Sequence, residues 1–381
     1  MKNRLWITAA LFMAAVGLSA QNKSAGINLS LWKNRATQPL DSLQTTYFNV
    51  GIQSTMNRLN GIGFNLLPGV VHQDMNGIQL SAISNLVGRS MRGVQLSGIS
   101  NINGNQLVGL SAAGLVNIAG NNMHGVLLTG LINITGDEAR GVMGSGLINI
   151  TGNDAAGLQI AGLSNIAGAA FNGVNASGLL NVVGGAMNGI QLSGLGNITA
   201  EQLSGAQVSL FNYATKVKGV QMGLVNYYKD ELKGFQLGLV NANPQTKVQL
   251  MLFGGNTTKL NIAARFKNKL FYTVVGGGTH YLNFDDKFSA ALFYRGGLWL
   301  PLYKTLTVSG DLGYQHIETF DNKHYGIPAR LYALQARINL EAQLTKKLGL
   351  FATGGYGRSK AYGKSRTFDK GLILEAGVVL F

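Results

Sequence analysis

The sequence contains no cysteine. This absence excludes disulfide bonds, a thiol nucleophile, cysteine-ligated zinc and a lipid-modified N-terminal cysteine. Charge is also scarce, because only 12% of the residues are Asp, Glu, Lys or Arg, about half the usual share of a globular protein. Such a chain must cover its surface by stacking, by contact with lipid, or by both.

Long hydrophobic runs are missing after the N-terminus. No later stretch reaches the roughly 18 uninterrupted apolar residues of a membrane-spanning helix. The N-terminus itself predicts a signal peptide over residues 1–20, in which Lys2 and Arg4 precede a mostly apolar stretch that ends before Ser19-Ala20, a small-residue cleavage site. That stretch is short for a bilayer span of about 20 residues, which favours cleavage over an N-terminal anchor.

Glycine, by contrast, is abundant, with 53 glycines against five prolines. Glycines recur with a strict period of 16 from Gly61 to Gly205, and two shorter copies begin at Gly219 and Gly234. There is no G-X-Y period, so collagen is excluded. The 46% of apolar residues argues against disorder.

Asparagine and apolar residues keep the same phase as glycine. Asparagine falls eight positions after the repeat glycine in eight successive copies: Asn85, Asn101, Asn117, Asn133, Asn149, Asn165, Asn181 and Asn197. Apolar residues recur one, six and nine positions after the glycine, and a further mostly apolar position lies two before the next glycine: Met91, Leu107, Met123, Phe171 and Met187. These spacings fit short strands broken by turns and do not fit a 3.6-residue helical period.

We therefore predict a β-solenoid in which each 16-residue copy is one coil. Equivalent positions then stack about 4.8 Å apart, with the apolar residues in columns inside. The asparagines are expected to form a hydrogen-bonded ladder, because a buried amide without a partner costs a few kcal/mol.

Three other interpretations of the repeat were considered. A flat antiparallel meander stays open as an alternative. Transmembrane hairpins are disfavoured because each copy leaves two strands of about six residues, whereas a membrane strand needs about 9–11. Glycosylation at the Asn-Ile-Thr sequences of Asn133, Asn149 and Asn197 is disfavoured because other copies lack the threonine.

The residues after the repeats show longer polar–apolar alternation. Eight such segments are predicted, over 247–256, 258–267, 270–283, 287–301, 305–318, 330–344, 347–359 and 370–381. Short and long connections alternate between them, as in small outer-membrane barrels, and this asymmetry puts both barrel ends on the periplasmic side.

The polar faces of these segments predict the barrel interior. Six charged residues are expected there: Arg265, Arg295, Asp311, Arg337, Glu341 and Glu375. An eight-stranded barrel has no water channel, so these charges must pair in an internal salt-bridge network. The C-terminal LEAGVVLF resembles the insertion signal of outer-membrane barrels, but Phe381 then shares the inward parity of Glu375, where that resemblance implies a lipid-facing residue.

The predicted chain is thus all-β. It comprises a signal peptide over 1–20, an N-terminal cap segment over 21–60, a β-solenoid over 61–244 and an outer-membrane β-barrel over 245–381. The motifs GVQLSGISN and GFQLGLVN, within roughly residues 45–245, resemble those of bacterial surface-repeat outer-membrane proteins. This resemblance implies a surface or envelope location and no known chemistry.

These observations predict a non-enzymatic outer-membrane protein whose barrel anchors a periplasmic repeat domain with a structural or binding role. No cofactor or metal is expected, because none of the five histidines forms an HExxH pair or accompanies GxSxG. One alternative is a surface-exposed adhesin with exported repeats. Another is a lipid A-modifying enzyme, which would use histidines and acids near the predicted outer rim: His280, His316, His324, Asp285, Glu318 and Asp321.

The net charge of +15 bears on the partners. For a secreted chain, such charge matches anionic outer-membrane lipid and lipopolysaccharide better than nucleic acid. An unknown protein or glycan is the further partner expected on the repeat face.

Overall fold

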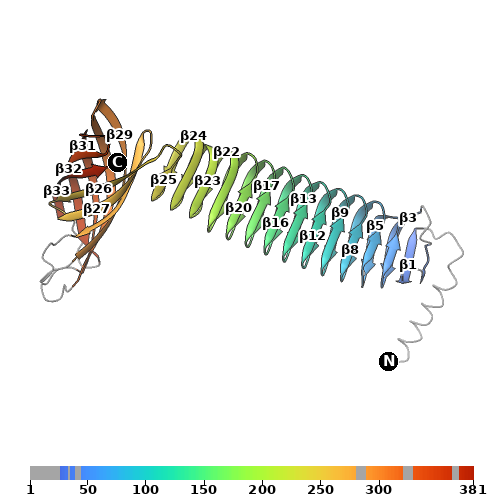
Figure 1. Ribbon diagram of the computed structural model, residues 1–381. Helices are drawn as coiled ribbons and strands as arrows, with labels where there is room; N and C mark the ends of the chain where they lie inside the picture. Colours follow the sequence, from blue (N-terminus) through green and yellow to red (C-terminus); the bar gives the residue numbers. More distant parts are fainter. Residues whose placement is uncertain (1–25, 33–34, 39–43, 280–288, 321–328, 363–368) are drawn as a thin grey trace. The chain divides into compact units, whose positions relative to one another are not determined.

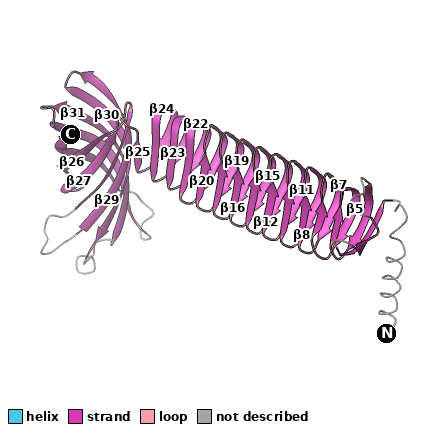
Figure 2. Cartoon of the chain, turned by 45° about the vertical axis from the view of Figure 1, so that its right-hand side comes forward, coloured by secondary structure: helices cyan, strands magenta, loops and turns pink. Residues whose placement is uncertain are grey.

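The computed structural model describes residues 26–32, 35–38, 44–279, 289–320, 329–362 and 369–381. All regular structure in these residues is β-strand (Figure 2), as the sequence predicted. In this part of the chain, no helix has the length and apolar character needed to cross a membrane. The chain divides into two compact units, residues 1–221 with 231–235 and residues 222–230 with 236–381.

The first unit is a β-solenoid (Figure 1). Each coil contains a long and a short strand, and each strand pairs in parallel with its counterpart one coil away. Gly125 lies opposite Gly141, and Asn133 lies opposite Asn149, so the register is the 16-residue period of the sequence. Parallel pairing confirms the solenoid and excludes the antiparallel meander.

The strands of the repeat follow in chain order. The long strands are β5 (Arg58–Asn65), β7 (Met75–Ser81), β9 (Met91–Ser97), β11 (Leu107–Ala113), β13 (Met123–Thr129), β15 (Ala139–Ser145), β17 (Ala155–Ala161), β19 (Phe171–Ser177) and β21 (Met187–Ser193). The short strands are β4 (Ser54–Met56), β6 (Gly69–Val71), β8 (Ser84–Val87), β10 (Ser100–Asn103), β12 (Val116–Ala119), β14 (Ile132–Thr135), β16 (Ile148–Thr151), β18 (Ser164–Ala167) and β20 (Leu180–Val183). In the last copies they merge into β22 (Gly196–Val208), β23 (Phe211–Met222) and β24 (Val225–Leu237), followed by β25 (Val240–Ala242).

The stack begins N-terminally of the predicted repeat boundary at residue 61. Strand β1 (Ile27–Trp32) pairs in parallel with β3 (Thr45–Gly51), and β3 pairs in parallel with β5. The two-residue strand β2 (Arg35–Ala36) pairs with β1 in the antiparallel sense. Much of the segment expected as a cap therefore continues the parallel stack, although it lacks the 16-residue glycine period.

The coil interior agrees with the prediction only in part: the apolar residues two positions before the repeat glycine, such as Met91 and Met187, are fully buried. Apolar residues one, six and nine positions after the glycine point outward, and Ile78, Leu115 and Ile166 are 39%, 43% and 37% exposed. The asparagines are fully buried instead. Successive side chains of a strand point to opposite faces, so an asparagine at the eighth position and an apolar residue at the ninth cannot both be inside.

The second unit contains a closed antiparallel barrel of eight strands, as predicted. The strands are β26 (Lys247–Gly255), β27 (Leu260–Lys267), β28 (Phe271–Thr279), β29 (Ser289–Tyr303), β30 (Leu306–Thr319), β31 (Arg330–Gln343), β32 (Leu348–Ala361) and β33 (Asp369–Leu380). Each strand pairs with the next, and β26 pairs with β33 to close the barrel. Most of the three long connections lies outside the described residues.

Residues 236–244 belong to the same compact unit as the barrel. Asn268, in the turn between β27 and β28, makes hydrogen bonds to this segment and to Thr246. Its side chain donates to the carbonyl of Asn241 (2.7 Å) and accepts from the side chains of Asn243 and Thr246.

Candidate functional site

The asparagine column runs through the interior of the first unit. The side-chain nitrogen of Asn133 donates to the side-chain oxygen of Asn149 at 2.9 Å, and Asn149 donates to Asn165 at 2.8 Å. Each of the eight predicted residues makes this bond to the next asparagine, at 2.8–3.1 Å, with Asn197 donating to Asn212, and Asn226 donates in the same way to Asn241. The structure thus brings all eight into one ladder.

Each ladder asparagine also holds the backbone of the following coil. The amide of Asn149 donates its second hydrogen to the carbonyl of Ile160 at 2.8 Å, and Asn133 donates to the carbonyl of Gly144 at 2.8 Å. Every one of these amides is 0% exposed. Asn133, Asn149 and Asn197 are therefore inaccessible as glycosylation acceptors in the folded chain.

The ladder extends in the N-terminal direction through residues that the sequence analysis did not include. Asn28 donates to Asn49 and Asn49 to Asn65, and Asn65 lies four rather than eight positions after the repeat glycine Gly61. Ser81 then accepts from Asn65 and donates to Asn85, which transfers the ladder between the two columns. The signal in the sequence that could have identified them is the 16-residue spacing of Asn49 and Asn65.

A second polar column lies inside the coils, two positions after the repeat glycine. Gln95 donates to Gln79 at 3.1 Å, and Gln207 donates to Gln191 at 2.7 Å. Methionine and leucine, with one phenylalanine, supply most of the large apolar side chains of the interior. The coil interior is therefore mixed, with columns of buried amides beside a column of large apolar side chains.

The outward-pointing side chains divide each coil into two edges. We define the apolar edge as positions 1–9 after the repeat glycine and the polar edge as positions 11–15. Only seven charged residues occur between 61 and 200, and all of them lie on the polar edge: Asp74, Arg89, Arg92, Asp137, Glu138, Arg140 and Asp154. The apolar edge carries isoleucine, leucine and valine in every coil of this range.

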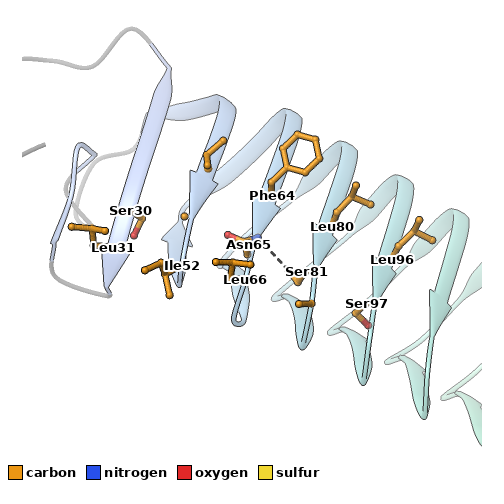
Figure 3. A pocket seen from close by; sticks show the side chains of 13 residues that line it. Ser30, Leu31, Ile52, Phe64, Asn65, Leu66, Leu80, Ser81, Leu96 and Ser97 are labelled. Atoms are coloured by element: carbon orange, nitrogen blue, oxygen red, sulfur yellow. Dashed lines mark hydrogen bonds between the residues drawn. The ribbon is translucent and has the colours of Figure 1, made fainter. Parts of the chain in front are cut away.

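A groove runs along the apolar edge. In the N-terminal coils its volume is about 600 Å³. Figure 3 shows Phe64, Leu80 and Leu96 in a row along one side of this groove, with Ile52 and Leu66 along the other. The same positions line a second groove in the later coils, where Ile160, Leu192 and Val208 contribute.

The barrel interior contains the six predicted charges, and all of them are paired. Arg265 and Glu341 form a two-pronged contact at 2.6 and 3.1 Å. Arg295 and Glu375 form another, at 2.8 and 3.1 Å. All four side chains are at least 92% buried, so each arginine neutralises a carboxylate away from water.

Arg337 connects Glu375 with Asp311, the third acid of the interior. Its guanidinium lies 3.3 Å from Glu375 and 3.9 Å from Asp311. Asp311 also accepts hydrogen bonds from the Tyr272 hydroxyl (2.8 Å) and the Asn339 amide (2.7 Å). The three arginines and three acids of the barrel interior therefore balance in formal charge.

Phe381 is partly buried and packs against the apolar cluster of this interior. Strand β33 pairs with β32 without a register shift, so the terminal phenylalanine keeps the inward parity of Glu375. The lipid-facing position that the C-terminal resemblance implied is therefore wrong for Phe381.

The outer wall of the barrel is apolar. Leu292, Leu312 and Ile338 point outward from three adjacent strands and are 68–72% exposed. Towards the long-connection end, the outward rings of Tyr314, Tyr332 and Tyr362 lie 5.0–6.4 Å apart or are joined through their hydroxyls. Apolar walls bordered by aromatic rings are typical of membrane barrels.

One part of this outer wall is covered by the last repeat copy. Thr273 and Tyr294 have outward parity, because Tyr272, Val274 and Phe293 belong to the interior cluster. The Thr273 hydroxyl donates to the carbonyl of Leu239 (3.1 Å), and the Tyr294 hydroxyl donates to that of Gly238 (2.7 Å). Thr273 is only 3% exposed as a result.

The histidine cluster considered for catalysis is described only in part. His316 points outward and lies 3.3 Å from Glu318, and its ring contacts that of Tyr362. His280, His324, Asp285 and Asp321 lie outside the described residues. Within the described ranges, no three His, Asp or Glu side chains are grouped so that they could hold a metal ion.

Comparison with known proteins adds no relative to this picture. No protein-family model matches the chain, and no curated protein matches it in sequence.

Proposed function

We propose that this protein is a non-enzymatic component of the outer membrane, in which the barrel is the anchor and the solenoid is a structural or binding element. The observation that supports this most strongly is the barrel, in which the six charged residues of the interior are paired and the outer wall is apolar. That distribution suits a lipid environment and leaves little interior space for a substrate.

The first experiment tests the anchor. The barrel in membrane fractions is expected to resist SDS at room temperature and to unfold on boiling, which gives two bands on a gel. Recovery of the full chain in the water-extractable fraction, with a single band at both temperatures, would contradict the proposal.

A second experiment tests the side of the membrane. The short turns and both barrel ends favour periplasmic repeats, so protease added to intact cells should leave residues 61–240 undigested, and permeabilised cells serve as the control. Digestion in intact cells would support the surface adhesin instead.

The lipid A-modifying enzyme is tested by the histidines. The variants His280→Ala, His316→Ala and His324→Ala are expected to leave lipid A unchanged by mass spectrometry. An altered lipid A profile in any of them would support catalysis.

A further inference from the structure

The apolar edge of the repeat unit forms one continuous surface, and we propose that it inserts edge-on into one leaflet of a phospholipid bilayer. The acyl chains contact the outward isoleucine and leucine columns and fill the groove between them, while the polar edge stays in water. The solenoid is then itself a membrane element. This inference rests on the proposed function in one respect, because the barrel is what brings the chain to the membrane.

The distribution of charge supports insertion. Between residues 61 and 200, the apolar edge carries no charged residue, whereas the polar edge carries all seven. A surface in water has no need of such segregation, but a charge held among acyl chains is strongly unfavourable.

The depth of the apolar edge matches one leaflet. Four residues separate the first position after the glycine from the turn at the fifth, which at about 3.3 Å per residue is about 13 Å. Half of a hydrocarbon core about 30 Å thick is about 15 Å. The polar edge begins where the apolar columns end, so it lies at the level of the head groups.

The backbone at the turn of the apolar edge is hydrogen-bonded, as lipid contact requires. The N–H of Leu163 donates to the carbonyl of Leu147, and the N–H of Leu179 donates to that of Leu163, both at 2.9 Å. The N–H of Gly194 donates to the carbonyl of Gly178 at 3.1 Å. Stacking thus satisfies turn groups that would otherwise need water.

The absence of cysteine permits a direct test, since any introduced cysteine is the only one. Leu163→Cys (apolar edge) and Ala169→Cys (polar edge of the same coil) are each labelled with an environment-sensitive fluorophore in the full chain. The protein is reconstituted in vesicles of phosphatidylethanolamine and phosphatidylglycerol. We expect the probe at position 163 to shift to the blue and to lose fluorescence when the acyl chains carry spin labels, whereas iodide quenches only the probe at 169.

Leu312→Cys on the barrel wall separates the two proposals. Quenching by spin-labelled lipid at 312 but not at 163 would overturn the insertion of the solenoid and leave the barrel anchor standing. The lack of lipid quenching at both positions would overturn the anchor as well. If the probe at 163 is shielded without lipid quenching, and the shielding grows with protein density, the edge binds a second copy of the chain and the inference is wrong.

Discussion

Asn149 uses its whole amide within the stack. It accepts from Asn133 and donates to both Asn165 and the carbonyl of Ile160. Asn149→Ala leaves three buried groups unpaired, and at about 1–3 kcal/mol for each we expect the unfolding free energy of the repeat unit to fall by about 3 kcal/mol or more. The measurement is the urea concentration at which residues 61–240 become sensitive to protease.

Asn153 provides the matched control, because it lies on the polar edge of the neighbouring turn and its hydrogen bond to Asp137 is exposed. Asn153→Ala is expected to change the same free energy by less than about 0.5 kcal/mol. Equal effects of the two substitutions would show that the ladder adds nothing to stability.

The repeat glycine is required by space and by backbone conformation together. Gly125 has a φ of 140°, and a Cβ there would lie 2.0 Å from the carbonyl oxygen of Gly109 in the previous coil. Gly125→Ala must push two coils apart in addition to the strain of about 1–3 kcal/mol for such a φ. We expect accelerated proteolysis of the repeat unit at 25 °C.

Gly144→Ala is the control in the adjacent coil. Its Cβ would meet only the flexible end of Leu128, at 2.9 Å, and its φ is not positive. Protease resistance should be unchanged there, and a loss as large as that of Gly125→Ala would contradict the steric explanation.

At the scale of the coil, one 16-residue copy can replace another, because each position stacks on the equivalent position of the next coil. Deletion of residues 125–140 removes one whole rung and allows Asn117 to meet Asn149, so the fold is expected to persist. Deletion of residues 125–132 removes half a coil and places strands against turns. Circular dichroism and limited proteolysis of both full-length deletions test this, and equal resistance of the two would contradict a phase-dependent stack.

The coil also marks how far sequence reasoning reaches. Period, strand positions and parallel stacking follow from the spacing of Gly125, Gly141 and their equivalents, since spacing is a local property. The inward face does not follow, because the asparagine and the isoleucine after it are equally periodic. Which of them is inside depends on whether the hydrogen bonds of Asn149 or the burial of Ile150 contributes more, and on what surrounds the coil.

The interior of the barrel was predicted better than the interior of the coil. Away from the strand ends, charged residues such as Arg337 and Glu341 fall on one parity, so the polar face is clear there. The individual partners, such as Arg265 with Glu341 across the barrel, depend on closure between strands far apart in sequence. Similarly, alternation alone could not predict that the last repeat copy covers Thr273.

In the whole molecule, the asparagine ladder stabilises the repeat unit and the buried ion pairs stabilise the barrel. These two sets of bonds share no residue. Glu375→Gln removes the charge that pairs with both Arg295 and Arg337, and loss of one partner of a buried ion pair costs about 3–5 kcal/mol. We therefore expect the temperature at which the barrel band shifts on a gel to fall, while the urea midpoint for proteolysis of the repeats stays unchanged. Asn149→Ala should do the reverse, since substitutions without shared partners act independently.

Glu318→Gln controls for surface charge, because Glu318 pairs with Arg330 in partly exposed positions and such pairs contribute about 0–1 kcal/mol. If Glu375→Gln also lowered the midpoint of the repeats, the units would unfold together, and the hydrogen bonds of Asn268 to the last copy would be the first place to look for the coupling.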